Sequence, residues 1–207
     1  MTKIILITGK AQSGKDTACD HLICKLTEHG KTARKYSFAD PLKQFLMTVF
    51  GCTYQQMYGS NADKDTFTKV KWTHLPKLPE WYAEAMPKGL YLSARQLMQY
   101  FGTEIVRTMY ENAWVEATVQ KVQHDKPDYA IICDCRFPNE IESVADGGIE
   151  TYTVRLLRNP LKGRHKSEIA LDKFDFSICK SFIEIDNKKM DCDDKNAAVW
   201  EFIKQTL

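Results

Sequence analysis

Apolar residues along the chain gather in short continuous runs, and longer stretches with helical periodicity separate these runs. The first run, Ile4–Ile7, is mostly β-branched, which is typical of a strand buried on both faces of a parallel sheet. Runs of the same kind predict further strands at Thr32–Phe38, Tyr129–Cys133, Thr151–Leu157 and Phe182–Ile185.

Helices are predicted between these strands. The first covers Lys15–His29 and ends at Gly30, because glycine readily adopts the left-handed conformation that closes a helix. Asp40 as N-cap, followed by Pro41, predicts a second helix that ends at Gly51. The other helical stretches are Ala94–Phe101 (after a capping box at Ser93 and Gln96), Glu104–Tyr110, Trp114–His124, Asn139–Asp146 and Lys195–Leu207.

Alternating strands and helices predict an α/β fold in three layers, with a parallel sheet and helices on both of its faces. The chain has 207 residues, enough for one compact domain, 1–207, and short of a comfortable two. Residues 52–92 interrupt the alternation, because they carry three prolines and many aromatic residues with little periodicity. We expect an irregular insertion there, with one helix near Glu80–Met86.

Composition narrows the classes of function. The net charge is only +2 and the basic residues form no stripe, so we expect no nucleic-acid partner and only local phosphate recognition. The seven cysteines lack the spacing of a metal site, which predicts free thiols in a reducing compartment. The apolar run at the N-terminus is too short for a signal peptide or a membrane span, so we expect a cytoplasmic protein.

The strongest chemical signal is the segment Gly9–Thr17, which matches G-x-x-x-x-G-K between a predicted strand and a predicted helix. Gly9 and Gly14 allow the backbone to curl so that its N–H groups point inward. The helix N-terminus and Lys15 add positive charge, and together these groups can hold the β- and γ-phosphates of a nucleotide. An ordinary strand–helix turn is the alternative interpretation.

The motif departs from the usual pattern at one position, because Asp16 stands where Ser or Thr usually ligates magnesium. A carboxylate can hold this metal directly or through water, so Asp16 is the candidate metal residue, and Thr17 is expected at the α-phosphate. A switch GTPase is disfavoured as well, since Asp134–Phe137 is not D-x-x-G and Asn187–Asp191 is one residue too long for N-K-x-D.

Polar residues follow the predicted strand Tyr129–Cys133. Asp134 is placed where a P-loop protein carries a second acidic residue near the metal, and Arg136 offers a bidentate fork for phosphate. Asn139 and Glu140 come directly after them. A surface loop with an Arg–Glu pair is the alternative.

The segment Ser37–Lys43 follows the second predicted strand. Its helix N-terminus and Lys43 could receive the phosphate of a second nucleotide, and Phe38 could stack on a base; a capped helix alone is the other interpretation. Farther along, helical residues supply donors suited to a base edge or a phosphate, although a solvated helix face would look the same. They are Arg95, Gln99 and Arg107, of which the first two share a face by their i,i+4 spacing.

Basic residues crowd the segment 158–173, which includes Arg158, Lys162, Arg164 and His165. A flexible basic loop late in such a chain is typical of a lid that closes over the phosphates and excludes water. A solvated run of charges is the alternative.

These motifs occur in one order along nearly the whole chain: Gly9–Thr17, Asp40–Lys43, Ser93–Gln99 with Phe101–Glu104, Asp134–Arg136 and His165–Glu168. In this order the sequence resembles the deoxynucleoside monophosphate kinases of tailed bacteriophages, within the P-loop nucleoside monophosphate kinases. The resemblance is weakest at 52–92. It implies transfer of phosphate from ATP with Mg²⁺, a homodimer and, for a phage-encoded chain, the host cytoplasm.

The resemblance also implies residue roles. ATP contacts are expected at Ser13, Gly14, Lys15, Asp16 and Thr17. Substrate contacts are expected at Lys10, Ser37, Phe38, Lys43, Asp134, Arg136 and Asn139. We expect catalysis to involve Lys15, Asp134, Arg136 and, from the lid, Arg164.

The predicted reaction is ATP + dNMP to ADP + dNDP. The acceptor is a phosphate oxygen that is already ionised at neutral pH, so alignment and charge neutralisation suffice without a strong general base. Three alternatives remain open: another small-molecule P-loop kinase, since the Gly14–Asp16 ending is also similar to phosphomevalonate kinases; a nucleotide-binding module without transfer activity; and a structural protein with a chance motif.

Overall fold

The computed structural model describes residues 1–82, 89–160 and 169–207. They form two compact units, and each is described by itself. The sheet unit consists of Met1–Phe38 and Val115–Leu207, and the second unit consists of Ala39–Trp114. The predicted basic loop falls largely outside the described residues, Arg164 included, and so does most of the predicted helix Glu80–Met86.

A five-stranded parallel sheet forms the centre of the sheet unit, as predicted. The strand order is β2-β5-β1-β6-β7. Their bounds are β1 Lys3–Gly9, β2 Ala33–Tyr36, β5 Tyr129–Cys135, β6 Thr151–Leu156 and β7 Phe182–Ile185. Since β1 lies between β5 and β6, the loop that follows β1 leaves from the middle of the sheet.

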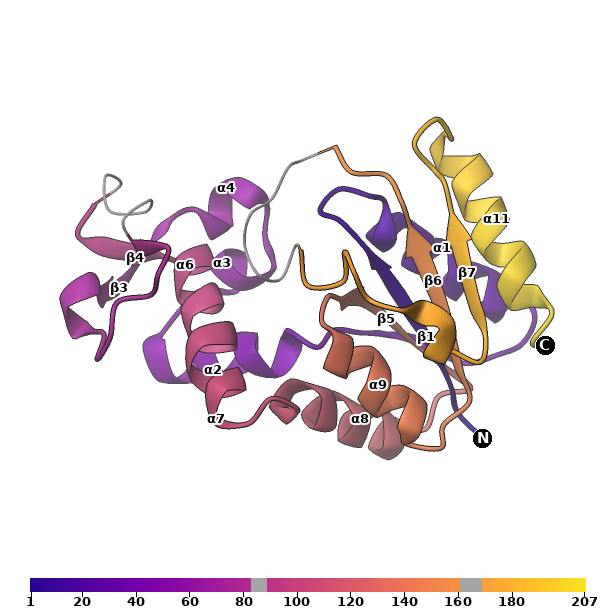
Figure 1. The fold of residues 1–207 in the computed structure, drawn as a ribbon, viewed down its shortest axis with the longest axis horizontal. Helices are drawn as coiled ribbons and strands as arrows, with labels where there is room; N and C mark the ends of the chain where they lie inside the picture. Colours follow the sequence, from indigo (N-terminus) through magenta and orange to yellow (C-terminus); the bar gives the residue numbers. More distant parts are fainter. Residues whose placement is uncertain (83–88, 161–168) are drawn as a thin grey trace. The chain divides into compact units, whose positions relative to one another are not determined.

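Helices cover both faces of this sheet, which completes the predicted three-layer fold (Figure 1). One face carries α1 (Lys15–Glu28) and α11 (Cys192–Lys204), and the other carries α8 (Ala113–Asp125) and α9 (Pro138–Asp146). Side chains alternate along β1, so Ile5 and Ile7 pack in the cluster with α1 and α11, while Ile4 and Leu6 point to the opposite face. All four are 0% exposed, as a strand buried on both faces requires.

Several boundaries in the sheet unit differ from the prediction, and two of the differences have a clear cause. Helix α11 begins at Cys192 rather than Lys195, because the Asp191 carboxylate caps it by accepting a hydrogen bond from the Asp194 N–H at 2.8 Å. Strand β5 runs on through Asp134 to Cys135, since it still pairs with β1 there. A short 3₁₀ helix, η4 (Phe176–Ile178), precedes β7.

The second unit has a core of its own, in which Leu46, Met57, Leu92 and Leu97 are fully buried. The described part of residues 52–92 is more regular than predicted, because it contains two α-helices, a 3₁₀ helix and two antiparallel strands. The unit comprises α2 Asp40–Phe50, α3 Tyr54–Tyr58, α4 Asn61–Lys64, β3 Phe67–Lys71, η1 Trp72–His74, β4 Tyr91–Ser93, α6 Ala94–Gln99, η3 Tyr100–Val106 and α7 Arg107–Met109.

Caps explain the helices of this unit. The predicted capping box before α6 is present, with the Ser93 hydroxyl accepting from the Gln96 N–H at 3.2 Å. The prediction for α2 was wrong by one residue: Ala39 is the N-cap, and Asp40 lies in the first turn. The segment η3 is a π-helix that joins the two predicted α-helices. Gly102 lies in this π-helix, and its carbonyl accepts a hydrogen bond from the Trp114 indole N–H at 3.1 Å.

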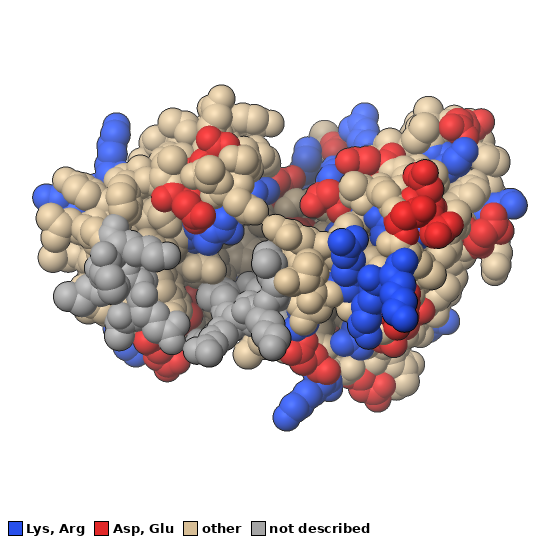
Figure 2. Space-filling view, turned by 90° about the horizontal axis from the view of Figure 1, so that it is seen from above, with Lys and Arg blue, Asp and Glu red and all other residues tan. Residues whose placement is uncertain are grey.

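Charged side chains of both signs are interspersed over the face seen in Figure 2, with one group of Lys and Arg side chains over the sheet unit. In the described part of the chain, no helix has the length and apolar character needed to cross a bilayer.

Replacement of Ile131 by alanine tests the packing of the sheet. Ile131 is 0% exposed on β5, so Ile131→Ala should lower the free energy of unfolding by about 2–5 kcal/mol. The matched control is Ile178→Ala, at a side chain that is 46% exposed, which should have little effect. Equal losses for both variants in urea denaturation would contradict this placement of the core.

Candidate phosphate-binding site

The loop between β1 and α1 is bounded by two glycines with positive φ. Gly9 has φ 148° and Gly14 has φ 96°, conformations that side-chain-bearing residues rarely adopt. A Cβ atom on Gly9 would lie 2.7 Å from the Leu156 carbonyl oxygen, so β6 leaves no room for one. The sequence therefore needs glycine at this position both for the backbone turn and for the close approach of β6.

Lys15 opens helix α1 and is 7% exposed. Its Nζ donates to the carbonyl oxygens of Gly9 and Lys10, each at 2.8 Å. The side chain thus folds back along the loop and places a positive charge beside the helix N-terminus. The combination of an unpaired helix end and a cation favours an anion such as a phosphate.

The hydroxyl of Ser13 is an unsatisfied group within this loop. Ser13 is 0% exposed, and among the described residues its Oγ has no hydrogen-bond partner. A buried hydroxyl without a partner costs about 1–3 kcal/mol, so a ligand oxygen at the loop would relieve a cost that the folded chain otherwise bears. The loop residues therefore fit the phosphates of a nucleotide.

The Asp16 carboxylate lies on the exposed side of the first turn of α1, with 80% of its side chain exposed. Lys35 of β2 forms an ion pair with it at 3.0 Å, and the Cys133 thiol donates to it at 3.6 Å. Partial burial opposes ionisation, but the hydrogen bond and charge of Lys35 outweigh it and hold the Asp16 pKa below its ordinary value. The carboxylate is therefore an ionised oxygen donor at neutral pH, as a magnesium ligand must be.

Three residues that the sequence analysis did not assign to the site surround the loop: Lys35, Asn187 and Lys195. Asn187 is 1% exposed, and its Nδ2 donates to the Ser13 carbonyl at 2.8 Å. Lys195 is 3% exposed, and its Nζ donates to the Gly14 carbonyl at 2.8 Å and to the Thr17 hydroxyl. The Thr17 hydroxyl in turn donates to the Gly14 carbonyl, and its predicted contact with an α-phosphate stays a prediction.

Asp134 connects the end of β5 to the segment that follows β2. Its carboxylate accepts hydrogen bonds from the Ser37 hydroxyl at 2.5 Å and from the Phe38 N–H at 2.9 Å. The structure therefore brings together Asp134, Ser37 and Phe38, which the sequence predicted as separate parts of one site. Phe38 is only 2% exposed, so stacking of its ring on a base would require its surroundings to open, and this role stays a prediction.

The turn after β5 is held by Glu140, which is 2% exposed. Its carboxylate accepts from the N–H groups of Arg136 at 2.6 Å and Phe137 at 3.0 Å. Asn139 is 7% exposed in the first turn of α9. Glu140 therefore contacts the backbone of Arg136, which fixes where the arginine side chain starts.

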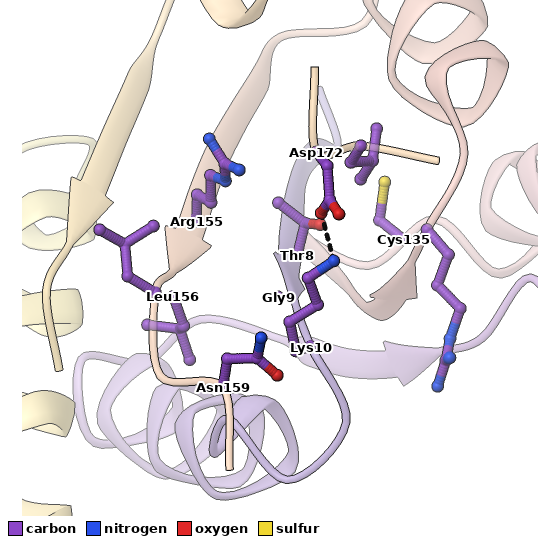
Figure 3. Close-up of a pocket in the computed structure, with 11 residues that line it drawn as sticks. Thr8, Gly9, Lys10, Cys135, Arg155, Leu156, Asn159 and Asp172 are labelled. Atoms are coloured by element: carbon purple, nitrogen blue, oxygen red, sulfur yellow. Dashed lines mark hydrogen bonds and ion pairs between the residues drawn. The ribbon is translucent and has the colours of Figure 1, made fainter. Parts of the chain in front are cut away.

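A cavity of about 120 Å³ lies at the carboxyl ends of β1, β5 and β6 (Figure 3). Ligands commonly bind at this edge of open α/β sheets. Its walls include Gly9 and Lys10 of the loop, Arg136 after β5, and Arg155 of β6. Lys10, predicted to contact substrate, forms an ion pair with Asp172 across this cavity (Figure 3). The start of the phosphate loop and Arg136 thus surround one space.

The remaining predicted substrate residues belong to the second unit. The amine of Lys43 lies 3.6 Å from the Asp40 carboxylate and 4.4 Å from the centre of the Tyr58 ring. Arg95 pairs with Asp65 at 2.7 Å. Gln99 and Arg107, on α6 and α7, are partly buried. Their contacts with a substrate stay predictions.

In this protein the central strand β1 leads through a loop bounded by Gly9 and Gly14 into helix α1, and the Lys15 amine folds over the loop. This arrangement is that of a P-loop nucleotide-binding protein. The same fold is found in the solved thymidylate kinase of Candida albicans, at a TM-score of 0.50 and 15% identity, over 99% of this chain and 92% of that one. This likeness concerns the fold alone.

The sequence comparisons define the family. The model of the deoxynucleotide monophosphate kinase family matches residues 63–175, more than half of the chain. The deoxynucleoside-5'-monophosphate kinase of Escherichia phage T5 is 27% identical over 179 residues, covering 69% of this chain and 71% of that protein. A relative from Acanthamoeba polyphaga mimivirus is 27% identical over 190 residues, covering 83% and 82% of the two chains.

The chain belongs to the deoxynucleotide monophosphate kinase family. The predicted family, fold class and class of enzyme, an ATP-dependent phosphotransferase, are thereby confirmed. The predicted roles of single residues remain to be tested.

Replacement of Gly9 by alanine tests the geometry of the loop. Gly9→Ala should cost more than the roughly 1–3 kcal/mol of a strained backbone, because the new Cβ would also collide with β6, and it should weaken ADP binding. Gly30→Ala is the matched control, since Gly30 has φ 71° with nothing within 4 Å of its Cβ position. Denaturation and calorimetry that gave the same result for both variants would refute the steric part of the argument.

Proposed function

We propose that the protein transfers the γ-phosphate of ATP to the phosphate group of a deoxynucleoside monophosphate, giving ADP and a deoxynucleoside diphosphate. One observation carries this proposal: Gly9 and Lys10, the first residues of the phosphate loop, line the same cavity as Arg136 at the carboxyl edge of the sheet. An arginine beside the start of a phosphate-binding loop suits the transfer of a phosphoryl group between two phosphates.

In this proposal the loop binds the donor. The inward N–H groups, the Ser13 hydroxyl and the Lys15 amine hold the β- and γ-phosphates, and Lys15 offsets the negative charge that spreads over the transferring group. Gly14, Asp16 and Thr17 complete the ATP site. No side chain needs to remove a proton, since the acceptor oxygen is already ionised.

Arg136 would hold the acceptor phosphate. Its backbone is fixed by Glu140, so the guanidinium starts from a defined position and can bind two phosphate oxygens at once. Asp134, which accepts from Ser37 and Phe38, would position the segment through which the acceptor is recognised. Lys10 and Asn139 complete the proposed acceptor contacts in the sheet unit, and Lys43, Arg95, Gln99 and Arg107 are the proposed contacts from the second unit.

Magnesium is the proposed metal, and Asp16 is the residue that would hold it, directly or through water. An exposed and ionised carboxylate next to Lys15 fits an ion that prefers oxygen ligands and keeps several waters. When bound, such an ion neutralises charge on the β- and γ-phosphates. Lys35, which pairs with Asp16, lowers the pKa of this carboxylate in the protein alone.

The test is an assay of ADP release with ATP as donor and every deoxy- and ribonucleoside monophosphate as acceptor. Turnover with one or more deoxynucleotides and weaker turnover with the ribonucleotides is the expected result. ATP binding without product from any monophosphate would instead indicate a nucleotide-binding module, and activity only with an unrelated acceptor would indicate another small-molecule kinase.

Homodimer formation and a viral origin with activity in the host cytoplasm are also part of the proposal. Large apolar side chains that remain exposed in the second unit, such as Val49 at 58% and Met109 at 82%, support a further interface. Sedimentation of the purified protein at the mass of a single chain, over a range of concentrations, would exclude the dimer.

Asp16→Asn tests the metal role. The change should raise the Mg²⁺ concentration for half-maximal rate more than it raises KM for the monophosphate, because a neutral amide is a weaker magnesium ligand. Asp20→Asn is a close control, since Asp20 lies one turn later on α1 and also pairs with Lys35. If both variants shift the magnesium dependence equally, Asp16 acts only through Lys35.

Arg136→Lys tests the acceptor site. The charge is kept but the bidentate fork is lost, so we expect a loss of roughly 2–4 kcal/mol in transition-state stabilisation, about 30- to 1000-fold in rate. ATP affinity without acceptor should barely change in calorimetry. Arg34→Lys, at an arginine whose side chain is 60% exposed, serves as control. Loss of ATP binding with retained monophosphate binding would move Arg136 to the donor site.

A further inference from the structure

Two buried side chains from the C-terminal part of the chain hold the outer side of the phosphate loop. Asn187 follows β7 and donates to the Ser13 carbonyl at 2.8 Å, and Lys195 of α11 donates to the Gly14 carbonyl at 2.8 Å. These two carbonyls belong to consecutive residues at the point where the loop enters α1. Both donors are almost fully buried, at 1% and 3% exposed.

The contacts determine where two N–H groups point. A peptide unit is planar and trans, so the N–H of one residue is directed opposite to the carbonyl of the residue before it. A hydrogen bond from Asn187 to the Ser13 carbonyl therefore turns the Gly14 N–H the other way. In the same manner, the hydrogen bond from Lys195 to the Gly14 carbonyl turns the Lys15 N–H away from Lys195. These N–H groups open α1, where a helix binds an anion.

Neighbouring groups support the contact of Lys195 with the Gly14 carbonyl. The Gly14 carbonyl also accepts from the Thr17 hydroxyl at 2.9 Å and from the Ala18 N–H at 3.1 Å, so Lys195 is one of three donors on this oxygen. A Cβ on Gly14 would lie 2.9 Å from the Lys195 amine, and the glycine thus leaves room for it.

Asn187 connects the loop to a second segment. Its Oδ1 accepts from the Arg158 N–H at 2.8 Å, directly after β6 and at the start of the predicted lid. Its own N–H donates to the Ile185 carbonyl at 3.0 Å, which fixes the turn after β7. The Asn187 side chain therefore uses both its donor and its acceptor to hold the phosphate loop and the segment after β6 at fixed positions relative to each other.

We infer that Asn187 and Lys195 are positioning residues for ATP: they orient the Gly14 and Lys15 N–H groups toward the β-phosphate without touching the nucleotide. The inference rests on the proposed role of Gly9–Thr17 as the ATP loop. Asn187 and Lys195, from the C-terminal part of the chain, would thus affect the affinity for the donor through the loop backbone, and would not affect the affinity for the acceptor.

Two substitutions test the inference. Asn187→Asp keeps the shape and the acceptor for Arg158 but places a carboxylate oxygen against the Ser13 carbonyl. Lys195→Met keeps most of the aliphatic chain and removes the amine. Each should weaken ADP binding by about tenfold or more, as expected when a buried polar partner is lost, and should leave deoxynucleoside monophosphate binding within about twofold of the wild type. Both affinities are measured by calorimetry on the folded full-length chain.

A control on helix α11 distinguishes a role in positioning the loop for ADP from a role in stability alone. Val199 is 0% exposed one turn after Lys195, so Val199→Ala should lower the melting temperature without changing ADP affinity. If the loss of ADP affinity in the two test variants only follows their loss of folded protein, or if ADP and monophosphate affinities fall together, the inference is wrong. Should Asn187→Asp fail to fold because of its buried charge, Asn187→Ala gives the same comparison.

The binding comparison is independent of turnover. A wild-type protein that binds ADP but phosphorylates no monophosphate would overturn the proposed function, while the ADP affinities of the variants would still decide the inference. Wild-type affinity for ADP in both folded variants would overturn the inference and leave the proposed function standing.

Discussion

The orientation of two peptide units at the start of α1 is the constraint on which the rest of the site depends. Their N–H groups can face a phosphate only while their carbonyl groups are held on the opposite side, and Asn187 and Lys195 hold them there. The glycine at position 14 follows from the same requirement, because a larger residue would displace the Lys195 amine. The phosphate loop is therefore a local motif whose backbone is held in part by residues from the end of the chain.

The same principle applies at the edge of β5. Carboxylates there accept hydrogen bonds from backbone N–H groups: the buried Glu140 from Arg136 and Phe137, and the half-buried Asp134 from Phe38. A loop at the end of a strand would otherwise leave these donors without partners, at a cost of about 1–3 kcal/mol each when they are buried. These contacts fix the backbone from which the Arg136 side chain starts. Polar residues clustered after a strand thus serve the fold and the site at once.

Local patterns were sufficient for much of this fold, because a buried strand such as Ile4–Ile7 and a glycine-bounded loop are specified by neighbouring residues. Asn187 and Lys195 could not be found in this way. Asn187 meets Ser13 across 174 positions of sequence, and the contact exists only because β7 and β1 are carried in the same sheet. From the sequence alone, Asn187 counted only as an imperfect guanine motif and Lys195 as the start of a helix. In residues 52–92, prolines and aromatic residues conceal short elements whose caps, such as Thr53 and Ser60, are their clearest signal.

The two lysines at the loop have different physical tasks. Lys195 is bound to the Gly14 carbonyl on the outer side, and burial lowers the pKa of its amine below the ordinary value, so it is a costly cation to keep in place. Lys15 donates to the carbonyls of Gly9 and Lys10. A nucleotide phosphate is a stronger, charged acceptor than either carbonyl, so Lys15 can exchange these partners for it when the nucleotide binds. That exchange leaves the Ser13 and Gly14 carbonyls satisfied, because they depend on other side chains. The loop can therefore give up Lys15 to the substrate without losing the backbone geometry that binds it.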